Sequence, residues 1–303
     1  MKLTNTLLTA AIFSFSVLGA AQVVYANVND DVLQQSVLSG GEQLAQGSSA
    51  FMNEEYETAF KLLKPLAEKG NALAQYLLGV MYVEDSIKGI KQDDIEAFKW
   101  YHKAAEQGVA KAQFDLGNMY YNGEGVKQDY VEAAKWYRKA AEQGEVEAQL
   151  NLGFMYDSGN GVQQDHAEAR KWYLEAAGQG EPQAQLNLGL MYENGEGVKQ
   201  DYFEAIKWYR QAAEQGHAEA QYKLGSMYAN GQGIRQNYEE AFYWLKKAAA
   251  QRNGVALGRI GVAYLTGEGV EQDKWKAKDY FGRSCEAGFQ LGCDMYRELN
   301  NEK

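Results

Sequence analysis

Two cysteines and three histidines are the side chains of this chain with the most distinctive chemistry. Cys285 and Cys293 are too far apart for the Cys-x-x-Cys spacing of a redox site, so they form either a disulfide or two free thiols. The histidines are His102, His166 and His217, and they stand in different parts of the chain. We interpret each histidine as a solvated surface residue rather than a metal ligand.

The motifs of the common hydrolases are missing from the sequence. A serine nucleophile of the penicillin-binding class needs Ser-x-x-Lys, and no serine here is followed by lysine at that spacing. Lys-Thr-Gly, a Walker loop and His-Glu-x-x-His are also absent. Asp157, Asn160 and Asp165 surround a glycine loop, but their spacing is not that of an EF-hand. We therefore expect no enzymatic activity, no cofactor and no metal site.

Five Gly-x-Gly loops could in principle cradle a phosphate group. Such a site needs a strand before the loop, whereas an amphipathic helical pattern precedes each loop here. Paired glycines also allow the positive φ angles of a sharp chain reversal. The repetition favours a structural turn, with the following apolar residue packed back as a plug. The five loops begin at Asn122, Ser158, Asn194, Asn230 and Thr266.

These loops belong to a repeat that dominates the chain. One glycine marks it, first after 38 residues and then every 36, at Gly79, Gly117, Gly153, Gly189, Gly225 and Gly261. A period of this length is typical of a stacked array in which no unit buries its apolar face alone. The predicted repeats cover residues 71–108, 109–144, 145–180, 181–216, 217–252 and 253–288.

Each repeat reads as two helices joined by the glycine loop. In residues 217–252, apolar side chains recur at helical spacing up to Tyr228, and a second helix carries a large aromatic residue, Trp244. The equivalent residues of the other repeats are Trp100, Trp136, Trp172, Trp208 and, in the sixth place, Tyr280. Gly225 in mid-helix indicates a close approach to another helix. Asp or Asn caps the second helix at capping-box spacing from a glutamate in five of the six repeats. Glycine ends the helix, but the fifth repeat has Arg252, where we expect an altered turn.

The pattern Ala-Gln-x-x-Leu-Gly-x-Met-Tyr, the Gly-x-Gly-Val loop and Ala-x-x-Trp-Tyr-x-x-Ala-Ala-x-x-Gly resemble Sel-1-like repeats, relatives of the tetratricopeptide repeat. The resemblance covers residues 71–288. It implies an all-α, right-handed α-solenoid superhelix and a non-catalytic protein–protein interaction scaffold. Residues 27–70 look like a degenerate helix pair, and residues 289–303 look like a C-terminal capping helix. Some cysteine-rich relatives have been described as penicillin-binding or weakly β-lactam-hydrolysing, which leaves β-lactam- or peptidoglycan-directed binding or hydrolysis as an alternative.

Cys285 and Cys293 stand near the end of the last repeat and near the start of the closing helix. Those ends face each other across a short turn, which suits a disulfide, and secretion would permit one. The spacing also resembles that of cysteine-rich bacterial members of the family, which join successive helices in this way. Two free thiols remain the alternative.

The positions that change between repeats share one face of the first helix. Tyr222, Ser226 and Ala229 are four and three residues apart, so they lie together, with Lys223 beside them. In tetratricopeptide-like arrays this face lines a concave groove. We expect it to bind a peptide or partner protein, with asparagine amides pairing with a peptide backbone. The candidate residues are Tyr76, Phe114, Asn118, Asn151, Phe154, Asn187, Tyr222 and Lys223. The alternative is that Leu150, Leu186 and Phe154 only pack on neighbouring helices.

The N-terminus and the charge indicate where such a scaffold works. Residues 1–26 read as a signal peptide, because Lys2 precedes an apolar run that ends in Val24-Tyr25-Ala26. We expect cleavage after Ala26 and a periplasmic or secreted protein, with a membrane anchor as the alternative. No other segment is apolar enough to span a membrane. The formal charge of −11 argues against nucleic acid as a partner.

Overall fold

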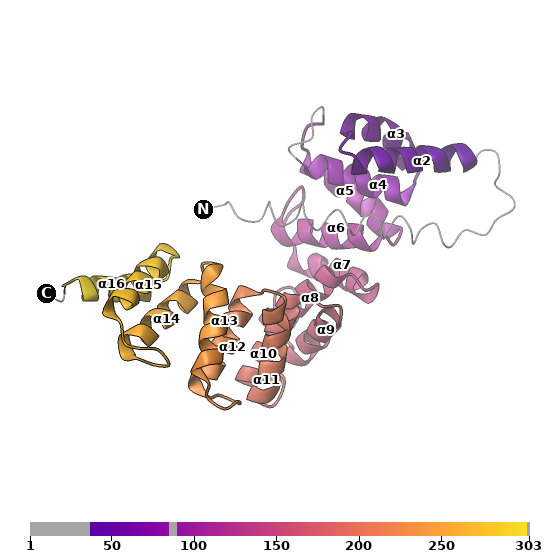
Figure 1. Cartoon of the computed structure of the whole chain (residues 1–303). Helices are drawn as coiled ribbons and strands as arrows, with labels where there is room; N and C mark the ends of the chain where they lie inside the picture. The colour runs from indigo at the N-terminus through magenta and orange to yellow at the C-terminus, as the bar shows by residue number, and fades with distance from the viewer. Residues whose placement is uncertain (1–36, 85–89, 302–303) are drawn as a thin grey trace. The chain divides into compact units, whose positions relative to one another are not determined.

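The computed structural model describes residues 37–84 and 90–301, and the regular structure of these residues is α-helical throughout (Figure 1). The chain divides into two compact units, residues 1–129 and residues 130–303. The predicted signal peptide lies outside the described residues. Within the described part of the chain, no helix is both long and apolar enough to cross a bilayer.

The N-terminal unit contains five described helices, each of which packs on the next along the chain. The first two occupy the segment in which we predict a degenerate helix pair. The helices are α2 (Val37–Met52), α3 (Tyr56–Glu68), α4 (Ala72–Val83), α5 (Asp94–Glu106) and α6 (Ala110–Asn122).

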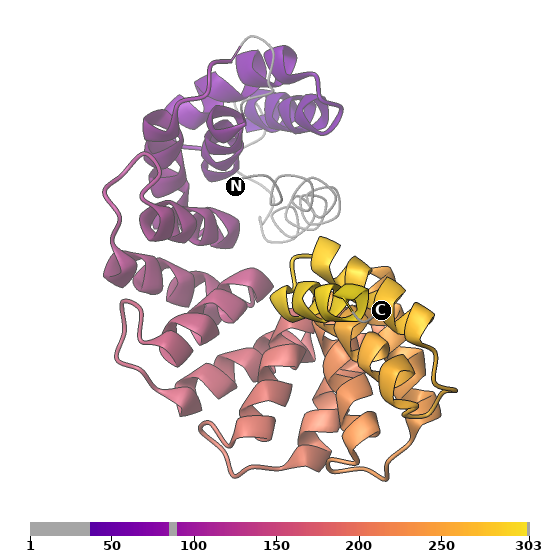
Figure 2. The same ribbon diagram turned by 90° about the vertical axis from the view of Figure 1, so that its left-hand side faces the viewer.

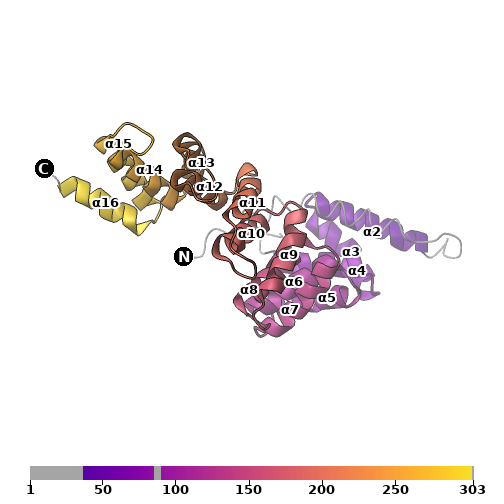
Figure 3. The same ribbon diagram turned by 90° about the horizontal axis from the view of Figure 1, so that it is seen from below.

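The C-terminal unit continues the same succession of packed helices. The loops within its helix pairs lie along one edge of the stack (Figure 2), and α16 lies beside α15 and α14 (Figure 3). The helices are α7 (Tyr130–Glu142), α8 (Val146–Ser158), α9 (His166–Gly178), α10 (Pro182–Asn194), α11 (Tyr202–Glu214), α12 (Ala218–Asn230), α13 (Tyr238–Ala250), α14 (Gly254–Thr266), α15 (Lys274–Glu286) and α16 (Gln290–Asn301).

The two helices of each repeat keep the predicted order. We call α4, α6, α8, α10, α12 and α14 the A helices, and α5, α7, α9, α11, α13 and α15 the B helices. The Asx cap is confirmed, for example at α9, where Asp165 Oδ1 accepts the N–H groups of Ala167 and Glu168 at 2.9 and 3.1 Å. Each cap satisfies donors that the first helical turn leaves without an intrahelical partner.

The second hydrogen bond of a capping box, from the backbone N–H of the cap residue to the glutamate side chain, does not form at Asp201. The backbone N–H of Asp201, which the glutamate side chain would accept in a capping box, donates instead to the carbonyl of Tyr192 at 2.9 Å. The box residue Glu204 pairs with Lys207 one turn later, at 2.5 Å between Oε1 and Nζ. The cap residue is therefore hydrogen-bonded to the end of the preceding A helix, and the glutamate forms a surface ion pair within its own helix.

The close helix approach predicted at the A-helix glycine is confirmed. A Cβ on Gly189 would lie 2.4 Å from the ring of Tyr209, and one on Gly153 would lie 2.6 Å from the ring of Tyr173. These tyrosines follow the repeat tryptophan and are among the largest fully buried side chains, whereas Trp172 keeps 6% of its surface exposed. In the fifth and sixth repeats Leu245 and Phe281 take the place of the tyrosine beside the glycine. The residue that follows the tryptophan position, rather than the tryptophan itself, therefore excludes a side chain from the glycine position.

A buried glutamine joins consecutive repeats. Gln221 is 3% exposed, and its Nε2 donates to the carbonyl of Ala213 in the preceding B helix at 3.1 Å. Its Oε1 accepts from Gln251 Nε2 at 3.0 Å. The amide thereby satisfies a carbonyl in the last turn of one B helix and is itself paired, as a buried polar group must be. The same bond from an A-helix glutamine to a carbonyl of the preceding helix recurs at Gln75, Gln113, Gln149 and Gln185.

The altered turn expected at Arg252 is wrong. Arg252 adopts φ +61°, in the left-handed region that Gly216 occupies one repeat earlier at φ +94°. Its N–H donates to the carbonyl of Ala249 at 3.0 Å, the same bond that Gly216 makes with Ala213. The turn keeps the same hydrogen bonds as the turn at Gly216, and Arg252 therefore adopts a strained backbone conformation that glycine would adopt without strain.

The Gly-x-Gly loops are structural turns, as predicted. A Cβ on Gly161, the second glycine of its loop, would lie 2.2 Å from the carbonyl oxygen of Tyr130 at the start of the preceding B helix. The apolar plug packs inward, with Ile234 partly buried against the core around Tyr209 and Met227. Each loop therefore closes the stack on the B helix of the repeat before it.

Candidate partner-binding surface

The A-helix variable face comprises the residues equivalent to Tyr222, Lys223, Ser226 and Ala229 in each repeat. In the N-terminal unit its predicted anchor Tyr76 is only 4% exposed and its ring centroid lies 5.9 Å from that of Tyr101. Tyr76 is therefore a core residue, and its assignment to a binding groove is wrong.

Phe114 and Asn118 lie half-buried on α6 in the same unit. The ammonium group of Lys111 lies 5.8 Å from the centre of the Phe114 ring. The exposed portion of this part of the face is therefore an aromatic edge with a cation beside it and an amide one turn later.

Phe154 and Asn151 form the most accessible part of the variable face in the C-terminal unit. Phe154 on α8 is 47% exposed, although phenylalanine is among the residue types most often buried. Asn151 lies half-buried on the same helix, and its side chain makes no hydrogen bond to any residue that the structure describes. An exposed ring and an amide with unused donors and acceptors are suited to contact another chain.

Asn187 occupies the position equivalent to Asn151 but is already bonded. Its Oδ1 accepts from Gln183 Nε2 at 3.0 Å. It also hydrogen-bonds the hydroxyl of Tyr173, whose pKa is raised by burial and by Asp157, against a lowering effect of Asn187. The amide of Asn187 therefore supports the fold, and it is less available to a peptide than that of Asn151.

Lys223 is held in an ion pair that the sequence analysis did not identify. Its Nζ lies 2.9 Å from Glu193 Oε2 on the neighbouring A helix, and the Tyr209 hydroxyl donates to the same oxygen at 2.5 Å. Burial and the hydrogen bond to Glu193 raise the pKa of Tyr209. Glu193 occupies the variable position of Ala229, so comparing that position across all repeats would have found it.

The remaining variable-face residues mainly pack against the core. Tyr222 is half-buried against the cluster that contains Phe242 and Leu257. Leu186 is 1% exposed, and Leu150 packs partly buried against the core around Tyr173. These two leucines therefore pack on neighbouring helices, which was the alternative to a binding role. Phe154 is too exposed to have only a packing role.

The histidines do not converge within the described residues. His166 Nδ1 lies 2.8 Å from Asp157 Oδ1, His102 lies beside Glu106, and His217 caps α12. No three metal-ligating side chains gather anywhere in the described ranges. The described part of the variable face thus offers aromatic, amide and paired ionic groups, which are contacts for recognition.

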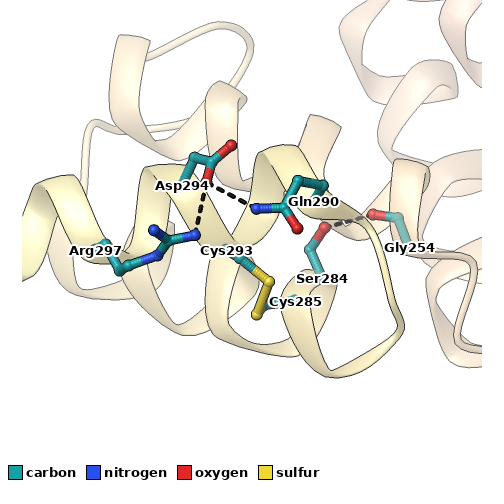
Figure 4. The surroundings of a disulfide bond; sticks show 7 residues. All are labelled: Gly254, Ser284, Cys285, Gln290, Cys293, Asp294 and Arg297. Atoms are coloured by element: carbon teal, nitrogen blue, oxygen red, sulfur yellow. Dashed lines mark hydrogen bonds and ion pairs between the residues drawn. A yellow bond between two sulfur atoms is a disulfide. The ribbon is translucent and has the colours of Figure 1, made fainter.

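Cys285 on α15 and Cys293 on α16 are paired in the structure, with Cα atoms 4.4 Å apart (Figure 4). They occupy the places of Ala213 and Gln221, so the pair stands where the first five repeats form the hydrogen bond of the buried glutamine; the sixth repeat has Leu257 at that position. Beside them, the hydroxyl of Ser284 donates to the carbonyl of Gly254 at 2.6 Å. Whether the protein carries this disulfide in the cell stays a prediction.

The repeats match a known family model. A model described as Sel1 repeat matches residues 72–109, 110–145, 146–181, 182–217, 218–253 and 255–289. A short stretch of 31 residues, 10% of this chain, is 58% identical to an uncharacterized protein of Haemophilus influenzae, of which it covers 60%.

Two crystal structures have the same architecture. The first is c5321, a protective antigen present in uropathogenic Escherichia coli strains that displays an SLR fold, with a TM-score of 0.80 and 35% identity over 91% of this chain. This chain spans 60% of the length of that antigen. The second is a Sel1 repeat protein from Oxalobacter formigenes, with a TM-score of 0.71 and 37% identity over 80% of this chain and 96% of the other.

Proposed function

The chain belongs to the Sel1 repeat family, and on that premise we propose that it is a non-catalytic scaffold that binds a partner protein or peptide through its A-helix variable face. Sel1 repeats usually mediate protein interactions. The observation that carries the proposal is Phe154, a 47% exposed ring on a face whose residues change from repeat to repeat. The repeated glycine, tyrosine and glutamine hold the stack, which leaves this face free to vary.

Export to the periplasm or beyond is the second part of the proposal. It rests on the apolar N-terminal segment with its small residues before position 27, and on the pairing of Cys285 with Cys293, which requires an oxidising compartment to persist. The mass of the protein purified from its native cell tests both points. We expect a chain that begins at Asn27 and is two hydrogens lighter than the dithiol form, and a mass that includes residues 1–26 would contradict export by cleavage.

The binding face is tested by replacing Phe154 and Asn151 with alanine in the tagged full-length protein. We exclude Asn187 from this variant, because its loss would leave the buried Tyr173 hydroxyl without its partner. The control is Phe203→Ala, which removes a similar ring that is 61% exposed on a B helix. Partner recovery after crosslinking in the native cell should fall in the double variant and persist in the control. Equal recovery from all three proteins would count against this face.

A further inference from the structure

A second surface with recognition chemistry lies on the B-helix side of the C-terminal unit. A recess of about 790 Å³ lies along α13 and is bordered by Gly269 and Val270 of the loop that follows α14. It is lined by Tyr238, Glu239, Phe242, Tyr243, Lys246, Lys247, Ala250, Gly269 and Val270. None of these residues belongs to the A-helix variable face.

The floor of the recess is apolar and fixed in place. Gly269 sits so close to α13 that a Cβ there would lie 2.2 Å from Tyr238 Cβ. Phe242 is 8% exposed and meets Tyr264 edge-on, with ring centroids 6.0 Å apart, while Val270 packs against the same cluster. The recess is therefore preformed, which lowers the entropic cost of binding.

Its rim offers an exposed aromatic ring and two lysines. Tyr243 is 51% exposed, and Lys247 lies over its ring at 4.5 Å. Neither Lys246 nor Lys247 makes an ion pair with any described residue, and the positions three and four residues away on α13 carry no acid. Glu239 is the one acidic residue that lines the recess, and it stands two turns before Lys246, about 10 Å along the helix axis.

The equivalent recesses on the neighbouring B helices have fewer cations without an acidic partner. On α11, Lys207 is paired with Glu204 at 2.5 Å, and the Arg210 guanidinium donates to the Tyr228 hydroxyl at 2.6 Å. On α15, Arg283 lies 3.8 Å from Asp279 within the recess itself, and Lys278 is the one lining cation there that makes no ion pair with a described residue. Among these three recesses, only that of α13 combines an apolar floor with two ammonium groups that make no ion pair with a described residue. These groups lie over aromatic rings instead, Lys246 over Phe242 at 5.6 Å and Lys247 over Tyr243 at 4.5 Å.

We propose that the α13 recess binds a peptide segment in which a carboxylate stands next to an aromatic or aliphatic side chain. The side chain occupies the floor formed by Phe242 and Val270, and the carboxylate pairs with Lys246 and Lys247. Charge complementarity selects this ligand, because an unpaired lysine pair beside an aromatic ring favours an anion with an apolar neighbour. A side-chain carboxylate and a C-terminal carboxylate share this chemistry. The proposal is independent of the A-helix variable face.

The test titrates the full mature chain with three short peptides and follows NMR shifts of the Tyr243 and Lys246 amides. The first peptide is acetylated, amidated and carries a central Phe-Glu-Glu, the second carries Phe-Gln-Gln, and the third ends in a phenylalanine with a free carboxylate. We expect the first or third peptide to bind at least about tenfold more tightly than the second, as a charge-assisted pair predicts. The difference between the first and third identifies the source of the carboxylate.

A double variant, Lys246→Gln with Lys247→Gln, should lose at least about tenfold in affinity for the preferred peptide. The control variant, Lys171→Gln with Lys207→Gln, removes the same charge from B-helix lysines that are already paired, and it should bind normally. The proposal is overturned if no peptide shifts these amides at millimolar concentration, if Phe-Gln-Gln binds equally well, or if both double variants behave alike. Lysine-dependent binding to anionic phosphatidylglycerol vesicles in place of the peptides would also overturn it.

Discussion

Two glycines in the consecutive helices α9 and α10 have opposite effects on stability. Gly189 in α10 has the ring of Tyr209 where its Cβ would be, whereas Gly178 at the end of α9 has no atom within 4 Å of that position. The first glycine is demanded by packing, and the second only lowers helix stability. The sequence shows a repeated glycine at the first position, but the reason for it is the large buried residue packed on it, which is Tyr209 here and Leu245 or Phe281 in the last two repeats.

Gly189→Ala is expected to lower the free energy of unfolding by about 1–3 kcal/mol, because the added methyl group overpacks the Tyr209 ring. Gly178→Ala is the matched control and should be neutral or stabilising by up to about 1 kcal/mol. Chemical denaturation of both variants beside the parent chain measures the difference. Equal stability of the two variants would contradict the packing role of the tyrosine.

Arg252 holds a left-handed conformation that its backbone hydrogen bonds impose. Arg252→Gly should therefore raise the stability by roughly 1 kcal/mol, since the strain of a non-glycine residue exceeds the extra chain entropy of glycine. The reciprocal change Gly216→Ala should lower stability by a similar amount. Thermal unfolding of the two variants measures the direction of both stability changes. A destabilised Arg252→Gly protein would show that the arginine side chain has a structural role.

His217 makes the cap of α12 sensitive to pH. Its Nδ1 accepts from the N–H of Ala220 at 3.4 Å and its Nε2 lies 3.2 Å from Gln183 Oε1, an arrangement that suits the neutral ring with its proton on Nε2. Burial lowers the pKa of His217 from its ordinary value of 6.5, against the opposing effect of Glu219 and Glu181. The unfolded chain therefore binds this proton first as the pH falls.

Stability contributed by His217 should accordingly be present above pH 6.5 and decline as the pH falls from there towards the lowered pKa of the folded state. His217→Asn keeps a cap of the type that Asn253 forms with Ala256 at 2.9 Å, but it does not titrate. The difference in unfolding free energy between parent and variant, measured from pH 8 to about pH 5, should move in favour of the variant at low pH. A difference that stays constant with pH would refute the assignment.

The last element, α16, depends on the cysteine pair more than on its own packing. Gly292 is the one buried residue of α16, and Leu291 is 55% exposed. At the position where the first five repeats have a buried glutamine, this helix has Cys293, which is paired with Cys285 of α15. The cysteine spacing predicted the pair, but its equivalence to the glutamine bond emerged only from the contacts of Gln221 and Ala213.

Replacing both cysteines with serine should remove about 2–3 kcal/mol of local stability from α16, the amount that closing so short a loop contributes. Amide hydrogen exchange should rise in residues 290–301 and stay unchanged in α8 to α12, since contacts in such arrays extend only to neighbouring helices. Addition of a reductant to the parent chain should have the same effect. Uniform protection of α16 in all three samples would show that packing alone holds the helix.

At the scale of the whole molecule, the sequence predicts the features that depend on local spacing within a repeat, but not those that depend on contacts between repeats. Helix order, Asx caps and loop turns follow from local spacing, and the structure confirms them. The candidate site did not follow as fully, because residues at the same repeat position differ in their tertiary partners: Asn187 is bonded where Asn151 is not, and Tyr76 is buried where Phe114 is half-buried. The Glu193–Lys223 ion pair was not predicted for the same reason, since it joins two repeats across the variable face.

The central claim is that the A-helix variable face around Phe154 binds the partner. A photo-crosslinking amino acid placed at position 154, and at position 203 as a control on the B-helix side, tests this claim in the native cell. We predict one dominant adduct from position 154 that is absent from position 203 and disappears when Asn151 is also replaced by an arginine. The absence of an adduct at position 154, or the same adduct from both positions, would contradict the account.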